Sequence, residues 1–475
     1  MKYDVIIIGG GLGGLICARQ LSKAGRSVLL LERQPQLGGC IQSYPRKGLH
    51  FDTGLHYVGG LDEGQMLHQL FSETGLLELP WQRMDSEGFD RVTIGRQTYC
   101  YAEGLEAFAD RMGSYFPKER EALRKYTTML EQAEQALFNP ERAMEMMEVN
   151  TYDYLCSLFS DPLLPQVLAG SSLKMELRRK SLPLYVFAHV NSSYIRSSWR
   201  LRGDGSLIVD KLAKDIRDMG GTILCNAEAE ELAEREGRIV AVRCTNGETY
   251  EGQTFISDVH PALTFGWIKA SQMLKPVFRQ RIALLENTTG MFTASLVLKP
   301  GSEGYFNHNK YVYRKPNVWD APFSESNSLE VDRVMISSYI TEEGAPQQID
   351  LLTPMPWKLC ERWADTHVGH RGADYIEMKR QLAASCIRLA ETVIPELSTM
   401  VSECYTSTPL TWRDYTQTPH GSAYGIRKDC HNVMMTMLSP KTPIPNLLLT
   451  GQSVLLHGLE GVAMTAVRTC GSIDN

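Results

Sequence analysis

The sequence predicts an α/β protein in which a domain of parallel strands and helices is interrupted by an inserted α+β domain. Three observations predict this fold class. A strand, a glycine-rich turn, a helix and a second strand follow one another at the start of the chain; the same alternation returns after residue 201; and the chain ends on one more strand, turn and helix. Between these parts lie short alternating strands and amphipathic helices.

Length and composition are those of an ordinary globular protein. The 475 residues include 49 Lys+Arg and 55 Asp+Glu, for a net charge of −6, and 43% of them are hydrophobic. This length predicts two or three domains with a large core. A pI near 6.0 without a run of basic residues argues against a nucleic-acid partner.

The lengths of the apolar segments and the spacing of the cysteines bear on where the protein is located and on which kinds of site it can hold. The longest apolar stretches, such as Leu182–Val190, fall short of the roughly 18 residues that cross a bilayer. Met1 runs into a strand without a secretory leader, so we expect a cytoplasmic protein, with peripheral membrane contact left open. The 11 cysteines, from Cys17 to Cys470, show neither CxxC nor CxxxxC spacing, which predicts no disulfide framework, no redox-active disulfide and no metal site.

The start of the chain predicts a βαβ half-unit. Tyr3–Ile8 and Ser27–Glu32 have the apolar character of buried strands, and Leu15–Ala24 has the pattern of a helix. The turn between them, Gly9–Gly14, fits GxGxxG. This context predicts a Rossmann-like dinucleotide site rather than an ordinary glycine turn.

Each residue of this motif is needed at its position for a physical reason. Gly9 allows the sharp turn, Gly11 lets backbone amides approach a pyrophosphate, and Gly14 lets helix and strand pack closely. The helix N-terminus adds amide donors and a positive dipole. Glu32 would accept hydrogen bonds from the ribose hydroxyls of adenosine, and its charge disfavours the 2′-phosphate of NADP.

Two further segments of the first domain come next, and the inserted region follows them. A second glycine cluster at Gly38–Gly39 and the segment Phe51–Tyr57 suggest backbone lying against an extended ligand, although ordinary loop turns fit equally well. The next element expected is a hairpin of Arg91–Ile94 with Thr98–Tyr101. Three helices should follow, at Gly104–Phe116, Lys118–Phe138 and Pro140–Val149. We interpret the Met group Met144, Met146 and Met147 as helix packing.

The remaining elements return to the first domain and complete the second. In the first domain we expect a helix at Leu207–Met219 and strands near Thr222–Cys225, Ile239–Cys244 and Thr249–Ile256. In the second we expect a sheet at Thr293–Leu298, Lys310–Tyr313 and Arg333–Ile340 and a helix at Tyr375–Ile394. The chain should end with a strand at Asn446–Thr450, a turn at Gly451–Gln452 and a helix from Gly458. The nucleotide domain is therefore predicted from residues 1–80, 201–265 and 431–475, and the substrate domain, with a helical cap, from 81–200 and 266–430.

Taken in order, these motifs resemble a known family of flavoproteins. The GxGxxG turn with Glu32, Gly38–Gly39, Phe51–Tyr57, Gly203–Ser206, Ser257–Pro261, Pro419–Gly425 and Thr450–Val462 are similar to segments of carotenoid desaturases and isomerases and retinol saturases, and more distantly of amine and protoporphyrinogen oxidases. The resemblance covers nearly the whole chain. It implies a Rossmann-like FAD-binding domain with an inserted α+β substrate domain, as in amine oxidases and phytoene desaturases.

The resemblance also implies the site residues. FAD would have its adenosine and pyrophosphate at the N-terminal motif and its flavin ring between His56 and the last helix. The implied FAD contacts are Gly9, Gly11, Leu12, Gly13, Gly14, Glu32, Arg33, Gly38, Gly39, Ser43, His56, Ala229, Gly451, Gln452, Gly461 and Val462. Candidates for proton transfer by position are His56, Tyr57, Tyr424 and His457; Glu460 fits a helix N-terminal charge instead.

The implied activity is hydride transfer at flavin N5 to or from a carbon–carbon bond of an apolar, polyene-like retinoid or carotenoid. Saturation and desaturation are not distinguished, and neither are the electron partner and the oligomeric state. Two alternatives stay open: an amine or protoporphyrinogen oxidase, and a lipid-binding protein like the GDP-dissociation inhibitors. The C-terminal glycine turn argues against the second. The region Leu105–Leu184 could line a substrate tunnel, rest on a membrane, or simply cap the domain.

Overall fold

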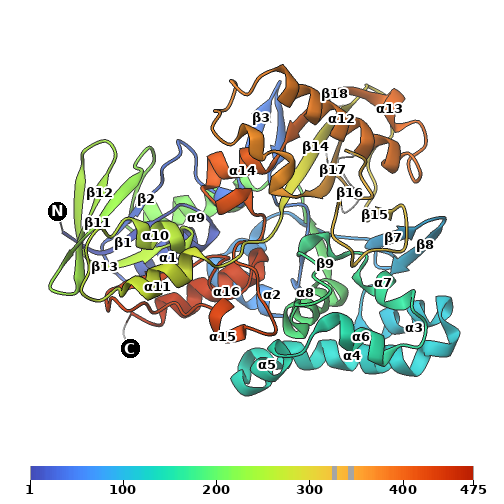
Figure 1. Ribbon diagram of the computed structural model, residues 1–475, viewed down its shortest axis with the longest axis horizontal. Coiled ribbons are helices and arrows are strands. Elements are labelled where there is room, and N and C mark those ends of the chain that lie inside the picture. Colours follow the sequence, from blue (N-terminus) through green and yellow to red (C-terminus); the bar gives the residue numbers. More distant parts are fainter. Residues whose placement is uncertain (1, 324–328, 341–346, 474–475) are drawn as a thin grey trace.

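In the part of the chain that the computed structural model describes, residues 2–323, 329–340 and 347–473, a seven-stranded sheet forms the centre of the lobe at the left of Figure 1. Its order is β10-β2-β1-β13-β12-β11, with β19 also beside β13. β12 pairs antiparallel with both β13 and β11, and the other pairs are parallel. The strands are β1 (Lys2–Ile8), β2 (Val28–Leu31), β10 (Thr222–Leu224), β11 (Ala229–Arg235), β12 (Arg238–Cys244), β13 (Thr249–Ser257) and β19 (Leu447–Leu449).

Helices cover both faces of this sheet, which explains why β1 is a continuous apolar run. Val5 and Ile7 point into one core, against the helices α1 (Leu12–Lys23), α9 (Ser206–Asp218) and α16 (Gly458–Cys470). Ile6 and Ile8 point into the core on the opposite face, against the shorter helices α10 (Pro261–Gly266) and α11 (Pro276–Ala283). The predicted Rossmann-like domain is thereby confirmed.

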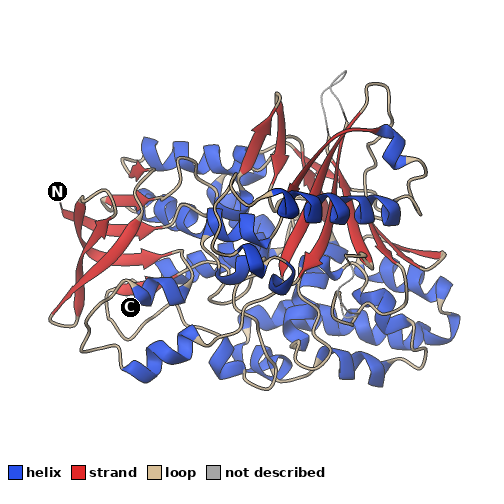
Figure 2. Cartoon of the chain, turned by 45° about the horizontal axis from the view of Figure 1, so that its top comes forward, coloured by secondary structure: helices blue, strands red, loops and turns tan. Residues whose placement is uncertain are grey.

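A second sheet, with order β18-β14-β17-β16-β15-β7-β8, forms the other lobe (Figures 1 and 2). All its pairs are antiparallel except β7 with β15. The long helix α12 (Ala373–Ala390) packs against it. The strands are β7 (Asp90–Ile94), β8 (Gln97–Tyr101), β14 (Gly290–Leu298), β15 (Asn309–Tyr313), β16 (Arg333–Ser338), β17 (Gln348–Met355) and β18 (Val401–Ser407).

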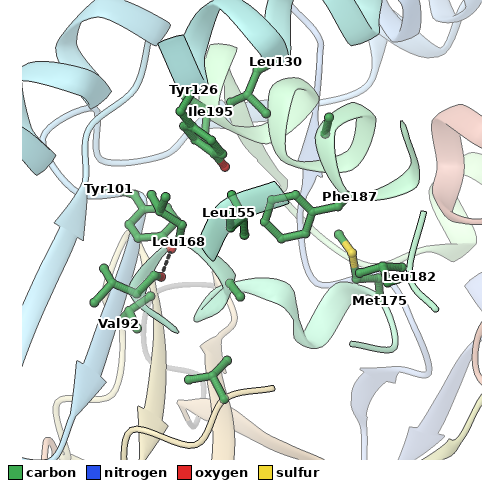
Figure 3. Packing of buried hydrophobic residues seen from close by; sticks show 14 of the residues in the cluster. Val92, Tyr101, Tyr126, Leu130, Leu155, Leu168, Met175, Leu182, Phe187 and Ile195 are labelled. Carbon is green, nitrogen blue, oxygen red and sulfur yellow. Dashed lines mark hydrogen bonds between the residues drawn. The ribbon is translucent and has the colours of Figure 1, made fainter. Parts of the chain in front are cut away.

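A layer of helices packs below this sheet and shares a large core with it (Figures 1 and 3). Tyr101 at the end of β8 donates a hydrogen bond to the carbonyl of Val167, inside this core. Met146 and Met147 are buried in the same core, as helix packing predicts. The helices are α3 (Leu105–Tyr115), α4 (Arg120–Gln135), α5 (Pro140–Met147), α6 (Thr151–Leu158), α7 (Leu164–Ala169) and α8 (Leu184–Arg196).

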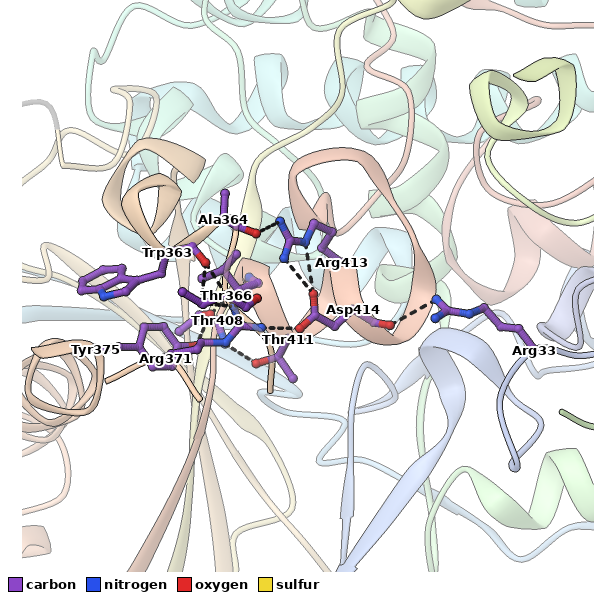
Figure 4. A network of polar contacts seen from close by, with 11 residues as sticks. Arg33, Trp363, Ala364, Thr366, Arg371, Tyr375, Thr408, Thr411, Arg413 and Asp414 are labelled. Carbon is purple, nitrogen blue, oxygen red and sulfur yellow. Dashed lines mark hydrogen bonds and ion pairs between the residues drawn. The ribbon is translucent and has the colours of Figure 1, made fainter. Parts of the chain in front are cut away.

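Short elements and one polar cluster join the lobes. Asp414, on α14 (Pro409–Thr416), accepts hydrogen bonds from Arg371 and Arg413, while its backbone carbonyl accepts one from Arg33, which follows β2, at 3.2 Å (Figure 4). The remaining elements are β3 (Ser43–Arg46), β4 (Leu49–Asp52), β5 (Val58–Gly59), α2 (Met66–Thr74), β6 (Trp81–Arg83), β9 (Ser198–Leu201), α13 (Leu397–Met400) and α15 (Val433–Thr436).

Three separate segments of the chain supply the first sheet. β1 and β2 come from its start, β10 to β13 from the middle and β19 from its end. The hairpin β7–β8 joins strands that follow residue 266 in the second sheet. The exact domain boundaries stay predictions. No helix within the described ranges has the length and apolar character needed to cross a membrane.

Candidate cofactor and substrate site

The site forms where the parallel strands of the first sheet end. Strand register places Leu31, Ile8, Ser257 and Leu449 level with one another across β2, β1, β13 and β19. The residues that follow these strands therefore meet at one edge. In open α/β sheets this carboxyl edge is where ligands bind.

The first glycine turn has the geometry that the motif predicts. Gly9 has a φ of +104°, and Gly11 is the N-cap of α1. A Cβ atom on Gly14 would lie 2.0 Å from the carbonyl oxygen of Gly9, so only glycine allows α1 to pack this close to the end of β1. The amide end of α1 consequently opens directly onto the cavity.

Glu32 is fixed at the end of β2. One of its carboxylate oxygens accepts the amide of Gly10 at 2.7 Å and the other accepts the amide of Gln34 at 2.8 Å. Burial raises the pKa of Glu32, while these two amides oppose that shift. The side chain lines the cavity, where it can meet a ribose.

The second glycine cluster lies against the first. The Gly38 amide donates to the Gly10 carbonyl at 2.8 Å, and a Cβ atom on Gly39 would lie 3.2 Å from Gly11 Cα. Two stretches of backbone without side chains are thus packed against one another, and both border the cavity, where an extended ligand could lie. Cys40, just beyond, also lines the cavity.

The C-terminal turn completes the same cavity from the other end of the chain. Gly451 follows β19 with a φ of +90°, and Gly458 opens α16 with a φ of +77°. Gln452 and Val462 line the cavity beside residues of the first turn. Segments more than 400 residues apart in the sequence therefore share one wall.

Most of the predicted site residues line this one cavity. They are Gly9, Gly11, Leu12, Gly13, Glu32, Arg33, Gly38, Gly39, His56, Tyr57, Ala229, Tyr424, Gly451, Gln452, His457 and Val462.

Three predicted FAD contacts do not line the cavity. Gly14 lies behind the turn, in the packing contact with Gly9. Ser43 begins β3 and donates a hydrogen bond to Asp204 at 2.8 Å, away from the cavity. Gly461 faces backward, since its Cβ atom would lie 2.7 Å from Leu456.

Away from the glycine turns the cavity wall becomes apolar. It is lined there by Leu173, Met291, Met335, Leu352 and Ala423, together with the rings of Tyr57, Tyr194 and Tyr424. Met291, Met335 and Leu352 come from the second sheet, Leu173 and Tyr194 from the helical layer, and the others from connecting segments. Such a wall suits an apolar ligand, with a few polar groups to orient it.

The two predicted histidines differ in their surroundings. Neither ring nitrogen of His56 has a hydrogen-bond partner among the described residues, although Nδ1 lies 3.7 Å from the carboxylate of Asp350. His457 Nε2 lies 3.2 Å from the Lys174 carbonyl, and its ring packs on Tyr424. Burial lowers the pKa of both histidines to about 4, so both are neutral at neutral pH.

A buried polar cluster surrounds Tyr57. Its hydroxyl lies 2.9 Å from Asp90 and 2.8 Å from the Tyr311 hydroxyl. The Lys174 ammonium donates to Tyr57 Oη at 3.3 Å, lies 3.7 Å from Asp90, and sits 4.1 Å from the centre of the Tyr194 ring. Burial lowers the pKa of Lys174 to about 8, against the pull of Asp90, whose own pKa burial raises.

Lys174 and Asp258 are two cavity residues that were not predicted as site residues, although Asp258 belongs to the segment Ser257–Pro261 that carries the resemblance. Lys174 ends a short helical turn in the helical layer, and no motif marks it. Asp258 follows β13, so the rule that ligands meet the carboxyl ends of parallel strands could have found it.

Comparisons with known proteins match the first domain and nearly the whole chain. Residues 7–74 match the model of an NAD(P)-binding Rossmann-like domain. The chain is 25% identical to the human protein named all-trans-retinol 13,14-reductase, over 99% of this chain and 85% of the relative. It is 24% identical to the chloroplastic prolycopene isomerase of Daucus carota, over 98% of this chain and 79% of the relative.

Solved structures share the fold. A wild-type putrescine oxidase bound to putrescine superposes with a TM-score of 0.66 at 16% identity, covering 100% of this chain and 99% of the other. The fold, the glycine turns and the relatives define the class of protein, an oxidoreductase with a Rossmann-like nucleotide-binding domain, as the sequence predicts. Within this class the chain is related over its full length to retinol saturases and carotenoid isomerases, which confirms the resemblance seen in its motifs.

Proposed function

We propose that the protein is an FAD-dependent oxidoreductase that saturates a carbon–carbon double bond of an apolar polyene of the retinoid or carotenoid type. The observation that carries this proposal is the single cavity. Glycine turns and Glu32 form one end of it, and apolar walls around the Lys174 ammonium form the other. The relatives named retinol reductases support the reducing direction.

The first end of the cavity fits a dinucleotide. Gly11 and Gly39 face each other without side chains, and the amide end of α1 lies beside them. Glu32 can accept the ribose hydroxyls, and its charge disfavours the 2′-phosphate of NADP. Ala229, which begins β11, lies at the cavity wall where the resemblance expects the adenine.

FAD in its reduced form, when bound, would supply a hydride at N5 to one carbon of the double bond, and the chain would have to supply the proton for the neighbouring carbon. Among the described residues at the apolar end of the cavity, Lys174 is the one best suited to donate this proton. Its ammonium form is populated at neutral pH because its pKa is about 8, whereas His56 and His457 are neutral there. Asp90 and Tyr57 hold the ammonium in place. A buried group with such a pKa is suited to general acid catalysis.

A substrate panel tests the proposal. The holoenzyme is reduced anaerobically and mixed with all-trans-retinol, a carotenoid, putrescine or a porphyrinogen, while flavin absorbance is followed. We expect a polyene to reoxidise the flavin and to gain two hydrogen atoms, measured by mass spectrometry. If polyenes leave the reduced flavin unchanged, while putrescine or a porphyrinogen reduces the oxidised enzyme and oxygen yields peroxide, the protein is an oxidase and the proposal is wrong.

A further inference from the structure

Asp258 occupies the centre of the glycine turns. Its Oδ2 atom accepts a hydrogen bond from the Gly14 amide at 2.9 Å. A Cβ atom on Gly13 would lie 2.5 Å from its Oδ1 atom, and a Cβ atom on Gly451 would lie 2.4 Å from the same atom. The carboxyl group fits here because both turns lack side chains, and it lies at the amide end of α1, where a diphosphate is expected.

No cation balances this group within the described ranges. Asp258 forms no ion pair there, and the nearest charged side chain that affects it is another acid, Glu32. The titratable groups on the elements packed around it are Glu32 after β2, Cys17 on α1 and Cys40 after the second glycine cluster. The two thiols stay protonated, because a hydrogen bond with the Cys470 thiol, together with burial, raises the pKa of Cys17, and burial raises that of Cys40 to about 12.

The position of Asp258 conflicts with a bound anion. A helix N-terminus stabilises negative charge, but a carboxylate and a diphosphate in the same buried place repel each other strongly. A neutral carboxyl group removes the repulsion and offers an O–H donor to a phosphate oxygen. Burial raises the pKa of Asp258 to about 7, against the Gly14 amide, so protonation is accessible near neutral pH.

We propose that Asp258 couples cofactor binding to the uptake of one proton, so that the carboxyl group is neutral when the FAD diphosphate lies beside it. This inference rests on the proposed function only in taking FAD as the ligand. It assigns a role to a residue at the diphosphate end, remote from the apolar end where the substrate would react.

The sign of the pH dependence follows from the protonation. Below the pKa of Asp258 in the free protein, near 7, the site is already neutral and FAD affinity is constant. Above it, each pH unit weakens binding by about tenfold, since the proton must first be taken up. Affinity therefore falls as pH rises, until the dissociation constant at pH 9 is up to about 50-fold that at pH 7.

Titration of FAD into protein freed of flavin tests this, with quenching of FAD fluorescence as the readout between pH 6 and 9. Wild type should show the slope, and Asp258→Asn, whose amide mimics the neutral acid, should bind FAD with little pH dependence. Asp52→Asn is the matched control. Asp52 is likewise a buried acid that accepts an amide at the start of a helix, from Gly205 at 2.7 Å, but it lies outside this cavity. That variant should keep the wild-type slope.

A second measurement needs no variant. Calorimetry of FAD binding at pH 8 in two buffers of different ionisation enthalpy should report uptake of about one proton per FAD. A wild-type affinity independent of pH, an Asp258→Asn variant with the wild-type slope, or no proton uptake would each overturn the inference. Failure of polyenes to react would contradict the proposed function alone, whereas failure of FAD to bind at any pH would contradict both.

Discussion

Lys174 is the residue whose placement is hardest to explain by stability alone. Its side chain is 8% exposed, and it lies between aromatic rings with Asp90 as its only ion-pair partner in the described structure. Replacing a buried ion pair by apolar residues often costs nothing. A buried ammonium that borders an apolar cavity is therefore better explained by a role in the reaction.

Substitution of Lys174 by Met should slow saturation of the polyene by about 10²- to 10⁴-fold, the usual contribution of a general acid. In wild type the rate should fall as pH rises above about 8, because the lowered pKa of Lys174 leaves the acid form only below that pH. Rapid-reaction measurements of flavin reoxidation between pH 6 and 10 would show this limb, and the limb should be absent from the variant.

Lys47→Met is a suitable control, since Lys47 is exposed and pairs with Glu403 far from the cavity. It should keep both the rate and the pH profile of wild type. A Lys174→Met variant with normal flavin content and a normal rate would exclude Lys174 as the acid. The four candidates predicted from the sequence would then need testing one by one, beginning with His56.

Sequence patterns identify a site residue when its local context is distinctive. Gly9, Gly11 and Glu32 stand in a motif whose spacing is dictated by one ligand, so their place in the cavity was predictable. Lys174 and Asp90 come from separate elements that meet only in the tertiary structure, and nothing local marks either one. Ser43 and Gly461 show the converse, since nearness in sequence to a binding turn does not bring a residue to the cavity.

Among the elements, the contact between α1 and β1 depends strictly on a single residue. Gly14→Ala would force a Cβ atom to within 2.0 Å of the Gly9 carbonyl. We expect a loss of about 1–3 kcal/mol in unfolding free energy, as for overpacked cores, and a marked loss of FAD affinity because the turn must shift. Denaturant unfolding and FAD titration would measure the two effects.

Gly266→Ala offers the matched control. Gly266 ends α10, and a Cβ atom there meets nothing within 4 Å. Its unfolding free energy and FAD affinity should stay at the wild-type values. Equal behaviour of the two variants would mean that the turn is not packed as described.

Helices and strands whose apolar residues recur with a clear period were predictable from the sequence, and those without such a period were not. β1, α1, β2 and the hairpin β7–β8 follow apolar patterns and glycine turns, and they lie within a few residues of the predicted bounds. β17 and β18 are absent from the prediction. β17 includes a proline, and β18 carries mainly polar side chains, so their pairing is decided by β14 between them rather than by local pattern.

At the scale of the whole molecule, a bound ligand would link distant parts of the chain. The cavity wall is drawn from the first turn, the Gly451 turn and both lobes, and the lobes otherwise meet in part through the Arg33–Asp414 contact. A ligand that binds only the folded state stabilises it by mass action.

FAD should therefore raise the melting temperature of the flavin-free protein. At 100 times its dissociation constant the gain is about 2.7 kcal/mol, which corresponds to a rise of a few degrees for a protein of this size. NADP at the same concentration should give little or no shift, because Glu32 repels its 2′-phosphate. Differential scanning calorimetry measures both; a larger shift with NADP would contradict the assigned ribose site.

The flavin content of the purified protein tests the central claim most directly. Flavin released from the protein on denaturation should be FAD, at about one molecule per chain, and the native protein should absorb in the blue as oxidised flavin does. A colourless protein that gains no flavin absorbance on incubation with FAD below pH 7 would contradict the account and favour a lipid-binding protein without flavin.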